Sequence, residues 1–191
     1  MMRMHQIFVI STAAILGAVV AACSLIEETL PGLTLSDSNV MSVLDSLGKN
    51  EIDAARLAQQ KAATPEVRAF AGRVLKEHRE LDEANRNLAA ELSVEPQTPL
   101  LASQFTAAHE DGMRTLRSAS GPAFDRAYLA HEIQQHVRAF NFVQAAAETE
   151  YTPELRQELV RAGPDLLSHI SAARALSRHL GVDPPKTIAS R

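Results

Sequence analysis

The chain has 191 residues, a length sufficient for one domain with a full hydrophobic core, and its formal net charge is −4. Tryptophan is absent, glycine is scarce, and Ala, Leu, Glu and Arg are plentiful, which is typical of an all-α protein. Charges of both signs are interspersed, so we expect no nucleic-acid partner, and neither a Gly-rich phosphate loop nor a Gly-x-Ser-x-Gly elbow is present.

Residues 1–22 have the pattern of a secretory signal peptide. Arg3 supplies a positive charge, and residues 7–20 form an uncharged run that is short for a membrane span. The sequence Val20-Ala21-Ala22-Cys23 then resembles the bacterial lipobox, in which the Cys is lipidated and becomes the first residue of the mature chain. An ordinary signal peptide with an incidental Cys is the alternative. Lipidation would give Cys23 a use, because a single thiol cannot form an internal disulfide.

The lipobox resemblance also implies a location. Ser24 follows the Cys, where an Asp would suggest retention at the inner membrane. We therefore expect a periplasmic protein of a Gram-negative bacterium, anchored by the lipid to the inner leaflet of the outer membrane. Residues 24–36 contain one Pro, one Gly and no sustained period, and are predicted to be a tether.

Apolar residues recur at spacings of three and four over residues 37–181, which predicts a helical bundle there. The five expected helices begin at Ser36 or Asp37, at Thr64, near Leu100, near Ala123 and at Thr152, and they end before Pro65, near Ser93, near Arg117, near Glu148 and before Gly181. Pro164 is expected to kink the last helix or to split off its first turns. Residues 182–191 are predicted to be a flexible tail.

Four polar residues lie on the apolar stripes of four of these helices. Glu51 precedes Thr64 by 13 residues and His78 follows it by 14, whereas His136 precedes Thr152 by 16 and His169 follows it by 17. Residues equally far from a tight turn lie at the same height in two antiparallel helices. If the two helix hairpins pack face to face, these four side chains converge.

A long connection with a short helix joins the two hairpins, and this order is that of the ferritin-like up-down four-helix bundle with a crossover. The segments Glu51-Ile52-Asp53-Ala54-Ala55, Val67-Arg68-Ala69-Phe70-Ala71, Glu77-His78, Phe124-Asp125-x-x-Tyr128, His136 and Leu166-Leu167-x-His169 resemble a bacterial envelope family of unknown function. Its members are exported, ferritin-like and often labelled as outer membrane proteins. The resemblance covers about residues 37–180 and implies the fold and export, but no chemistry.

The expected site is a metal centre of Glu51, His78, His136 and His169, with Asp82, Glu132 and Tyr128 as further ligands or as their supports. Imidazoles and a carboxylate suit zinc, iron, copper or manganese. The alternative is a buried hydrogen-bond network without metal. His109 and His131 lie outside the main apolar stripes and are expected to be solvated, and His179, in the last turn of its helix, is expected to have no role in the site.

Three functions remain open from the sequence: a metal-binding envelope protein with a stress-related role, a metal-free structural or interaction module with a protein partner, and a redox enzyme. The di-iron centres of this fold use Glu-x-x-His on two helices, but Leu75 and Leu166 stand three residues before His78 and His169. We therefore expect no catalytic residue, and an enzyme is the least favoured of the three.

Overall fold

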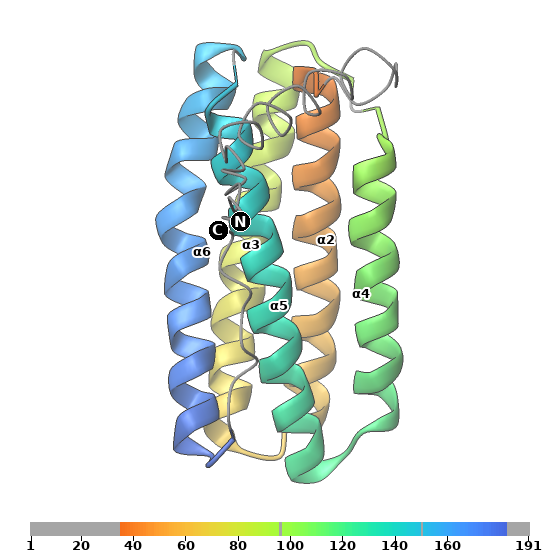
Figure 1. Cartoon of the computed structure of the whole chain (residues 1–191), viewed down its shortest axis with the longest axis vertical. Helices are drawn as coiled ribbons and strands as arrows, with labels where there is room; N and C mark the ends of the chain where they lie inside the picture. Colours follow the sequence, from red (N-terminus) through yellow and green to blue (C-terminus); the bar gives the residue numbers. More distant parts are fainter. Residues whose placement is uncertain (1–34, 96, 150, 183–191) are drawn as a thin grey trace, which may run out of the picture. The chain divides into compact units, whose positions relative to one another are not determined.

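The computed structural model describes residues 35–95, 97–149 and 151–182, which form five helices and no strand (Figure 1). The helices are α2 (Asp37–Lys61), α3 (Pro65–Glu91), α4 (Leu100–Ser118), α5 (Gly121–Ala147) and α6 (Pro153–His179). The predicted signal peptide, Cys23, nearly all of the tether and residues 183–191 lie outside the described residues. Within the described part, none of the helices combines the length and the apolar character needed to cross a bilayer.

Local sequence signals set the ends of the helices. Ser36 caps α2 through a reciprocal capping box with Asn39, and the Thr64 hydroxyl accepts a hydrogen bond from the Val67 N–H at the start of α3. These starts agree with the predicted ones. Pro164 does not split the last helix, because α6 is continuous from Pro153 to His179. Packing of α6 along its length against α5 and α3 holds the turns on both sides of the proline.

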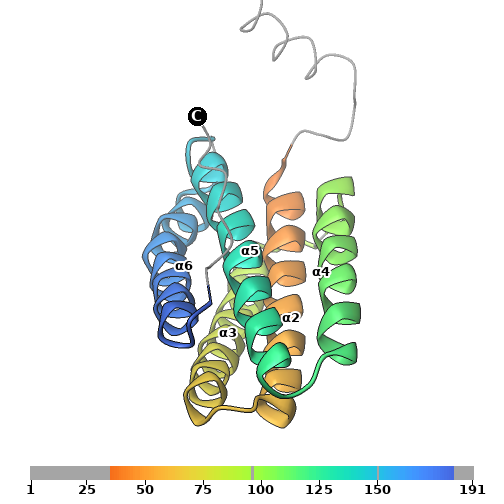
Figure 2. The ribbon, with the colours of Figure 1, turned by 60° about the horizontal axis from the view of Figure 1, so that its bottom comes forward.

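Consecutive helices run in opposite directions, as Figures 1 and 2 show. The most extensive contacts are between α2 and α3 and between α5 and α6, and further contacts join α2 to α5 and α3 to α6. Helix α4 packs against α2 and α5 on the outside of these four. The described part of the chain is therefore a helical bundle with one additional helix on its flank.

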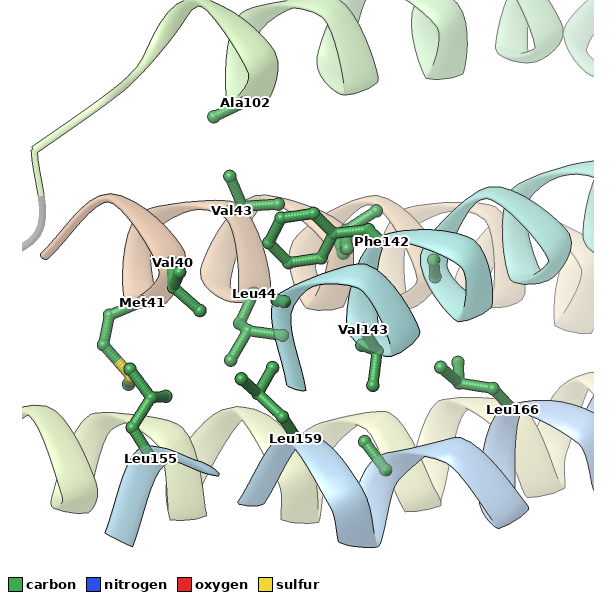
Figure 3. Close-up of a cluster of buried hydrophobic side chains, with 14 of the residues drawn as sticks. Val40, Met41, Val43, Leu44, Ala102, Phe142, Val143, Leu155, Leu159 and Leu166 are labelled. Carbon is green, nitrogen blue, oxygen red and sulfur yellow. The ribbon is translucent and has the colours of Figure 1, made fainter. Parts of the chain in front are cut away.

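The apolar core consists of two clusters that occupy different parts of the bundle. The first is shown in Figure 3, where Leu44 of α2 faces Val143 of α5 and Leu159 of α6. On the other side of α2, Val43 points toward Phe142 of α5 and Ala102 of α4. The second contains residues from the other halves of the same helices, including Ala55, Val67, Phe70, Tyr128 and Ala173. Between the two clusters each of these four helices carries a buried polar residue, and these residues form the candidate site.

Candidate metal centre

A buried polar layer divides the two apolar clusters. On α2 it contains Glu51, on α3 His78, on α5 Glu132 and His136, and on α6 His169. Each of these side chains is at least nine-tenths buried. On α2, α5 and α6 a polar residue of the layer lies one turn from an apolar residue of each cluster, such as Leu47 and Ala55 around Glu51. The structure thus brings together the four residues that the helical spacing places at one level.

Three imidazoles meet in this layer. His136 Nε2 lies 3.3 Å from His78 Nε2 and 3.0 Å from His169 Nδ1. The rings of His136 and His169 are perpendicular, with their centroids 4.9 Å apart, so that the edge of one ring faces the other. One nitrogen of each ring lies within 4.8 Å of the other two, which is close enough for all three to ligate one ion. Three nitrogen ligands of this kind are a common zinc-binding set.

The partners of the other ring nitrogens fix the tautomers of two of these histidines. His136 Nδ1 lies 3.0 Å from the Glu132 carbonyl oxygen, which can only accept, so Nδ1–H donates and Nε2 carries a lone pair. His169 Nε2 lies 2.5 Å from the Glu77 carboxylate, so Nε2–H donates and Nδ1 carries a lone pair. When both rings are neutral, two lone pairs therefore face each other across 3.0 Å. His78 Nε2–H can donate to His136, but this leaves His169 Nδ1 unmatched.

A cation between the facing lone pairs would remove their repulsion, and it could be a proton or a metal ion. Burial lowers the pKa of His136 well below its usual value, and the neighbouring His78 and His169 lower it further. Burial likewise lowers the pKa of His78 to about 3. Protonation of His78 and of His136 is therefore disfavoured at neutral pH. A metal ion needs neutral imidazoles, and the donor set fits one.

Two carboxylates lie on the opposite edge of His136. Glu51 Oε2 and Glu132 Oε2 are each 3.6 Å from His136 Nδ1, and both side chains are almost completely buried. Glu51 Oε2 and both Glu132 carboxylate oxygens have no hydrogen-bond partner among the described residues. Burial raises the pKa of Glu132 to about 8, and burial followed by the charge of Glu132 raises the pKa of Glu51 well above its usual value. These acids, with His136, form a second group with metal-ligand spacing.

The remaining predicted site residues lie at different distances from this centre. Tyr128 is completely buried next to Glu132, and burial followed by the Glu132 and Glu51 charges raises its pKa well above its usual value. Its hydroxyl has no hydrogen-bond partner in the described part of the chain. Asp82 belongs to neither ligand group and instead pairs with Arg86 at 2.6 Å. Glu77 is not among the predicted site residues, yet its carboxylate accepts a hydrogen bond from His169 Nε2–H.

The expectation that His109 and His131 are solvated is wrong, because both are buried between α4 and the bundle. Their ring centroids are 5.4 Å apart, and His109 Nε2 lies 3.5 Å from Asp53 Oδ2. Burial, with smaller contributions from His109 and Arg138, lowers the pKa of His131 to about 4. The helix periodicity did not reveal them because their burial depends on where α4 packs. His179, at the end of α6, is exposed.

A cavity of about 320 Å³ lies next to the three histidines, between α2, α3, α5 and α6. Glu51, His78 and His169 line it, so two of the three imidazoles border open space. Closed structural zinc sites use four protein ligands, whereas sites that bind exogenous molecules keep a position free. The arrangement can therefore hold an ion through three imidazoles while leaving room beside it.

Comparison with known proteins gives one match. No curated protein and no solved structure matches the chain. A family described as a domain of unknown function, DUF4142, matches residues 27–176. This match covers most of the chain, including all of the polar layer. The chain belongs to the DUF4142 family of domains of unknown function.

Proposed function

We propose that this protein binds a divalent transition-metal ion through His78 Nε2, His136 Nε2 and His169 Nδ1. The observation that carries the proposal is the 3.0 Å separation of two nitrogens whose lone pairs face each other. Glu77 and the Glu132 carbonyl act as supports that orient two ligands, an arrangement that is usual around metal-bound histidines. Imidazole ligands favour zinc, copper or iron over calcium and magnesium.

The metal proposal is tested by measuring the metal content and the melting temperature of the purified protein. We expect about one Zn²⁺, Cu²⁺, Fe²⁺ or Mn²⁺ per chain and a melting temperature that falls when a chelator is added, because a ligand that binds only the folded state stabilises it. His78→Ala and His169→Ala should abolish both effects, whereas His179→Ala, which changes an exposed histidine, should leave them unchanged. Sub-stoichiometric metal and a chelator-independent melting temperature would exclude the proposal.

The second candidate is a metal-free structural or interaction module. It is favoured by the hydrogen bonds that His136 and His169 already make to the Glu132 carbonyl and to Glu77. In that case His78 Nε2–H would donate a hydrogen bond to His136 Nε2. The polar layer would then serve to fix the register of the helices. A fully folded protein that binds none of the four metals would favour this candidate.

We also propose that the bundle is a ferritin-like domain that is exported and anchored through lipid on Cys23. The fold proposal is supported by the extensive contacts within the pairs α2–α3 and α5–α6, joined by a connection that carries α4. The export proposal is supported by the pattern of residues 1–23 and by a family match that begins at residue 27. Mass spectrometry of the protein from a bacterial envelope should find a diacylglyceryl group on Cys23, and Cys23→Ala should remove it. An unmodified chain cleaved elsewhere would exclude the lipid anchor.

A further inference from the structure

The cavity beside the histidines has the size and lining of a site for a small organic molecule. Its volume of about 320 Å³ is at the lower end of the range for small-molecule pockets, about 300–1,000 Å³. Most of its lining is apolar and comes from all four helices that surround it, with Leu47 from α2, Leu81 from α3, Val143 from α5 and Leu166 from α6. A hydrocarbon body would therefore contact apolar side chains from all four helices.

Gly48 keeps part of this cavity open. It is a buried residue in the interior of α2, where glycine is the least favourable choice after proline. A Cβ added at Gly48 would meet no atom within 4 Å, so the glycine does not serve a close approach between helices. Because Gly48 lines the cavity, a larger side chain at this position would extend into the open space. The residue weakens its helix and leaves room that the core does not fill.

The unpaired polar atoms of the cavity are mostly hydrogen-bond acceptors. Asn85 Oδ1 and Glu51 Oε2 are buried and have no hydrogen-bond partner among the described residues. Both side chains line the cavity, and both residues are at least nine-tenths buried. A buried acceptor without a partner is costly, so a molecule that brings N–H or O–H donors would be favoured here.

The charges around the cavity select among such molecules. Besides Glu51, three acids line it, Glu77, Glu80 and Asp165, together with one cation, Arg161. That guanidinium is already paired with Glu158, at 2.7 Å from its carboxylate. The lining is therefore net negative, which disfavours an anionic ligand such as a carboxylic acid and favours a cation.

We propose that the cavity binds a small organic amine with an apolar body. Its N–H groups supply the donors that Asn85 Oδ1 and Glu51 Oε2 lack. Its hydrocarbon part packs against the leucines of α2, α3 and α6 and against Val143 of α5. The proposal rests on the cavity and its acceptors. It concerns the protein without a metal ion, because a divalent ion on His78 and His169 would add positive charge to the lining. The test below therefore uses metal-free protein, and its outcome is independent of the metal test.

The test is calorimetric titration of the full-length protein, in chelator at pH 7, with n-hexylamine, n-hexanol and hexanoate. Hexylamine is cationic at this pH, the alcohol is neutral and hexanoate is anionic, while all three have the same hydrocarbon chain. We expect one hexylamine per protein, bound at least about tenfold more tightly than either of the others. No saturable binding of hexylamine, or equal binding of the alcohol or the acid, would overturn the proposal.

Matched variants locate the bound amine. Gly48→Leu fills the cavity and should weaken hexylamine binding at least about tenfold, whereas Gly48→Ala leaves most of the space and should bind as the wild type does. Asn85→Leu removes one acceptor and should also weaken binding. Circular dichroism checks that each variant keeps its helical content. Undiminished binding in folded Gly48→Leu would overturn the proposal.

A measurement on the wild-type protein keeps the proposal testable if these variants do not fold. Intermolecular NOEs should connect the hexylamine methylenes to the methyl groups of Leu47 and Leu166 in the cavity. Leu100, which is 68% exposed, should show none. NOEs to Leu100 without any to Leu47 or Leu166 would place the amine on the surface and overturn the proposal.

Discussion

Asp125 of α5 accepts two hydrogen bonds from the turn between α2 and α3, from the Thr64 N–H at 2.9 Å and from the Ala63 N–H at 2.8 Å. The side chain that makes them is almost completely buried. Because Thr64 is the N-cap of α3, this carboxylate fixes the start of α3 relative to α5. It thereby connects the two segments whose polar residues, His78 and His136, meet in the candidate site.

Replacing Asp125 by Ala should therefore destabilise the protein. The change leaves two backbone N–H groups without their acceptor, and one such buried donor costs about 1–3 kcal/mol. Urea unfolding should show that the free energy of unfolding falls by at least about 1–3 kcal/mol. The matched control is Asp111→Ala, which removes an exposed aspartate paired with Arg114 and should change stability by no more than about 0.5 kcal/mol. Equal effects of the two changes would mean that the carboxylate does not hold the turn.

Gly112 determines how closely α4 approaches the bundle. A Cβ at this position would clash with the imidazole of His131, so that α4 or the ring must move. We expect Gly112→Ala to cost about 1–3 kcal/mol through overpacking. Gly48→Ala is the control, since its Cβ meets nothing and alanine favours the helix by about 1 kcal/mol. Urea unfolding should show that Gly112→Ala lowers the free energy of unfolding and that Gly48→Ala raises it. A stabilising Gly112→Ala would contradict the packing of α4.

The buried acids predict that metal-free protein loses stability as the pH rises. The pKa of Glu132 is raised by burial from 4.5 to about 8, so the folded state keeps a proton that the unfolded state releases. This unfavourable contribution grows from about pH 4.5 to about pH 8. The pKa of His78 is lowered by burial from 6.5 to about 3, so its contribution to stability is lost as the pH falls below 6.5. The two effects oppose each other between pH 4.5 and 6.5.

Above pH 6.5 the titration of His78 no longer affects stability, so the effect of the buried acids on stability is not offset by it. One pKa unit corresponds to about 1.4 kcal/mol, so Glu132 should lower stability by roughly 2 kcal/mol between pH 6.5 and 8. Glu132→Gln should reduce this loss, since the amide does not ionise. Urea unfolding in chelator at pH 6.5 and pH 8 measures the difference for both proteins. A slope that Glu132→Gln does not change would show that another group carries it.

Helix periodicity was sufficient to place four residues of the polar layer at one level. Glu51, His78, His136 and His169 lie on apolar stripes, and their distances from the turns set their heights in antiparallel helices. The helix starts at Ser36 and Thr64 were likewise readable, because a cap is a local signal.

Other parts of the site depend on tertiary contacts that have no local signal. Glu77 lies beside the stripe and is 44% exposed, yet its side chain is long enough to reach His169 on another helix. His109 and His131 are buried only because α4 packs over them. The cavity could not be predicted, because no local sequence pattern marks a space that side chains leave unfilled. The sequence feature that accompanies it is Gly48, a glycine in the interior of a helix.

Glu77 provides the most direct test of the proposed metal centre, because it can be substituted while all three proposed metal ligands are kept. It accepts a hydrogen bond from His169 Nε2–H and so keeps the Nδ1 lone pair directed at the other imidazoles. Loss of a carboxylate in this position typically lowers metal affinity about 10–100-fold. We expect Glu77→Ala to lower Zn²⁺ affinity by that factor. Glu77→Gln should lower it less, because the amide oxygen still accepts the hydrogen bond without the charge.

Glu80→Ala is the matched control for Glu77→Ala. Glu80 is one turn further along α3, is exposed and pairs with Lys76 at 3.5 Å. Among the described residues it contacts none of the three histidines through a hydrogen bond or ion pair, so its removal changes only the charge near the cavity. Competition titrations with a zinc-sensitive dye should therefore give nearly wild-type affinity for Glu80→Ala. An equal fall in both variants would mean that Glu77 acts through its charge alone. In that case the hydrogen bond to His169, and with it the tautomer that directs a lone pair at His136, would not determine metal binding.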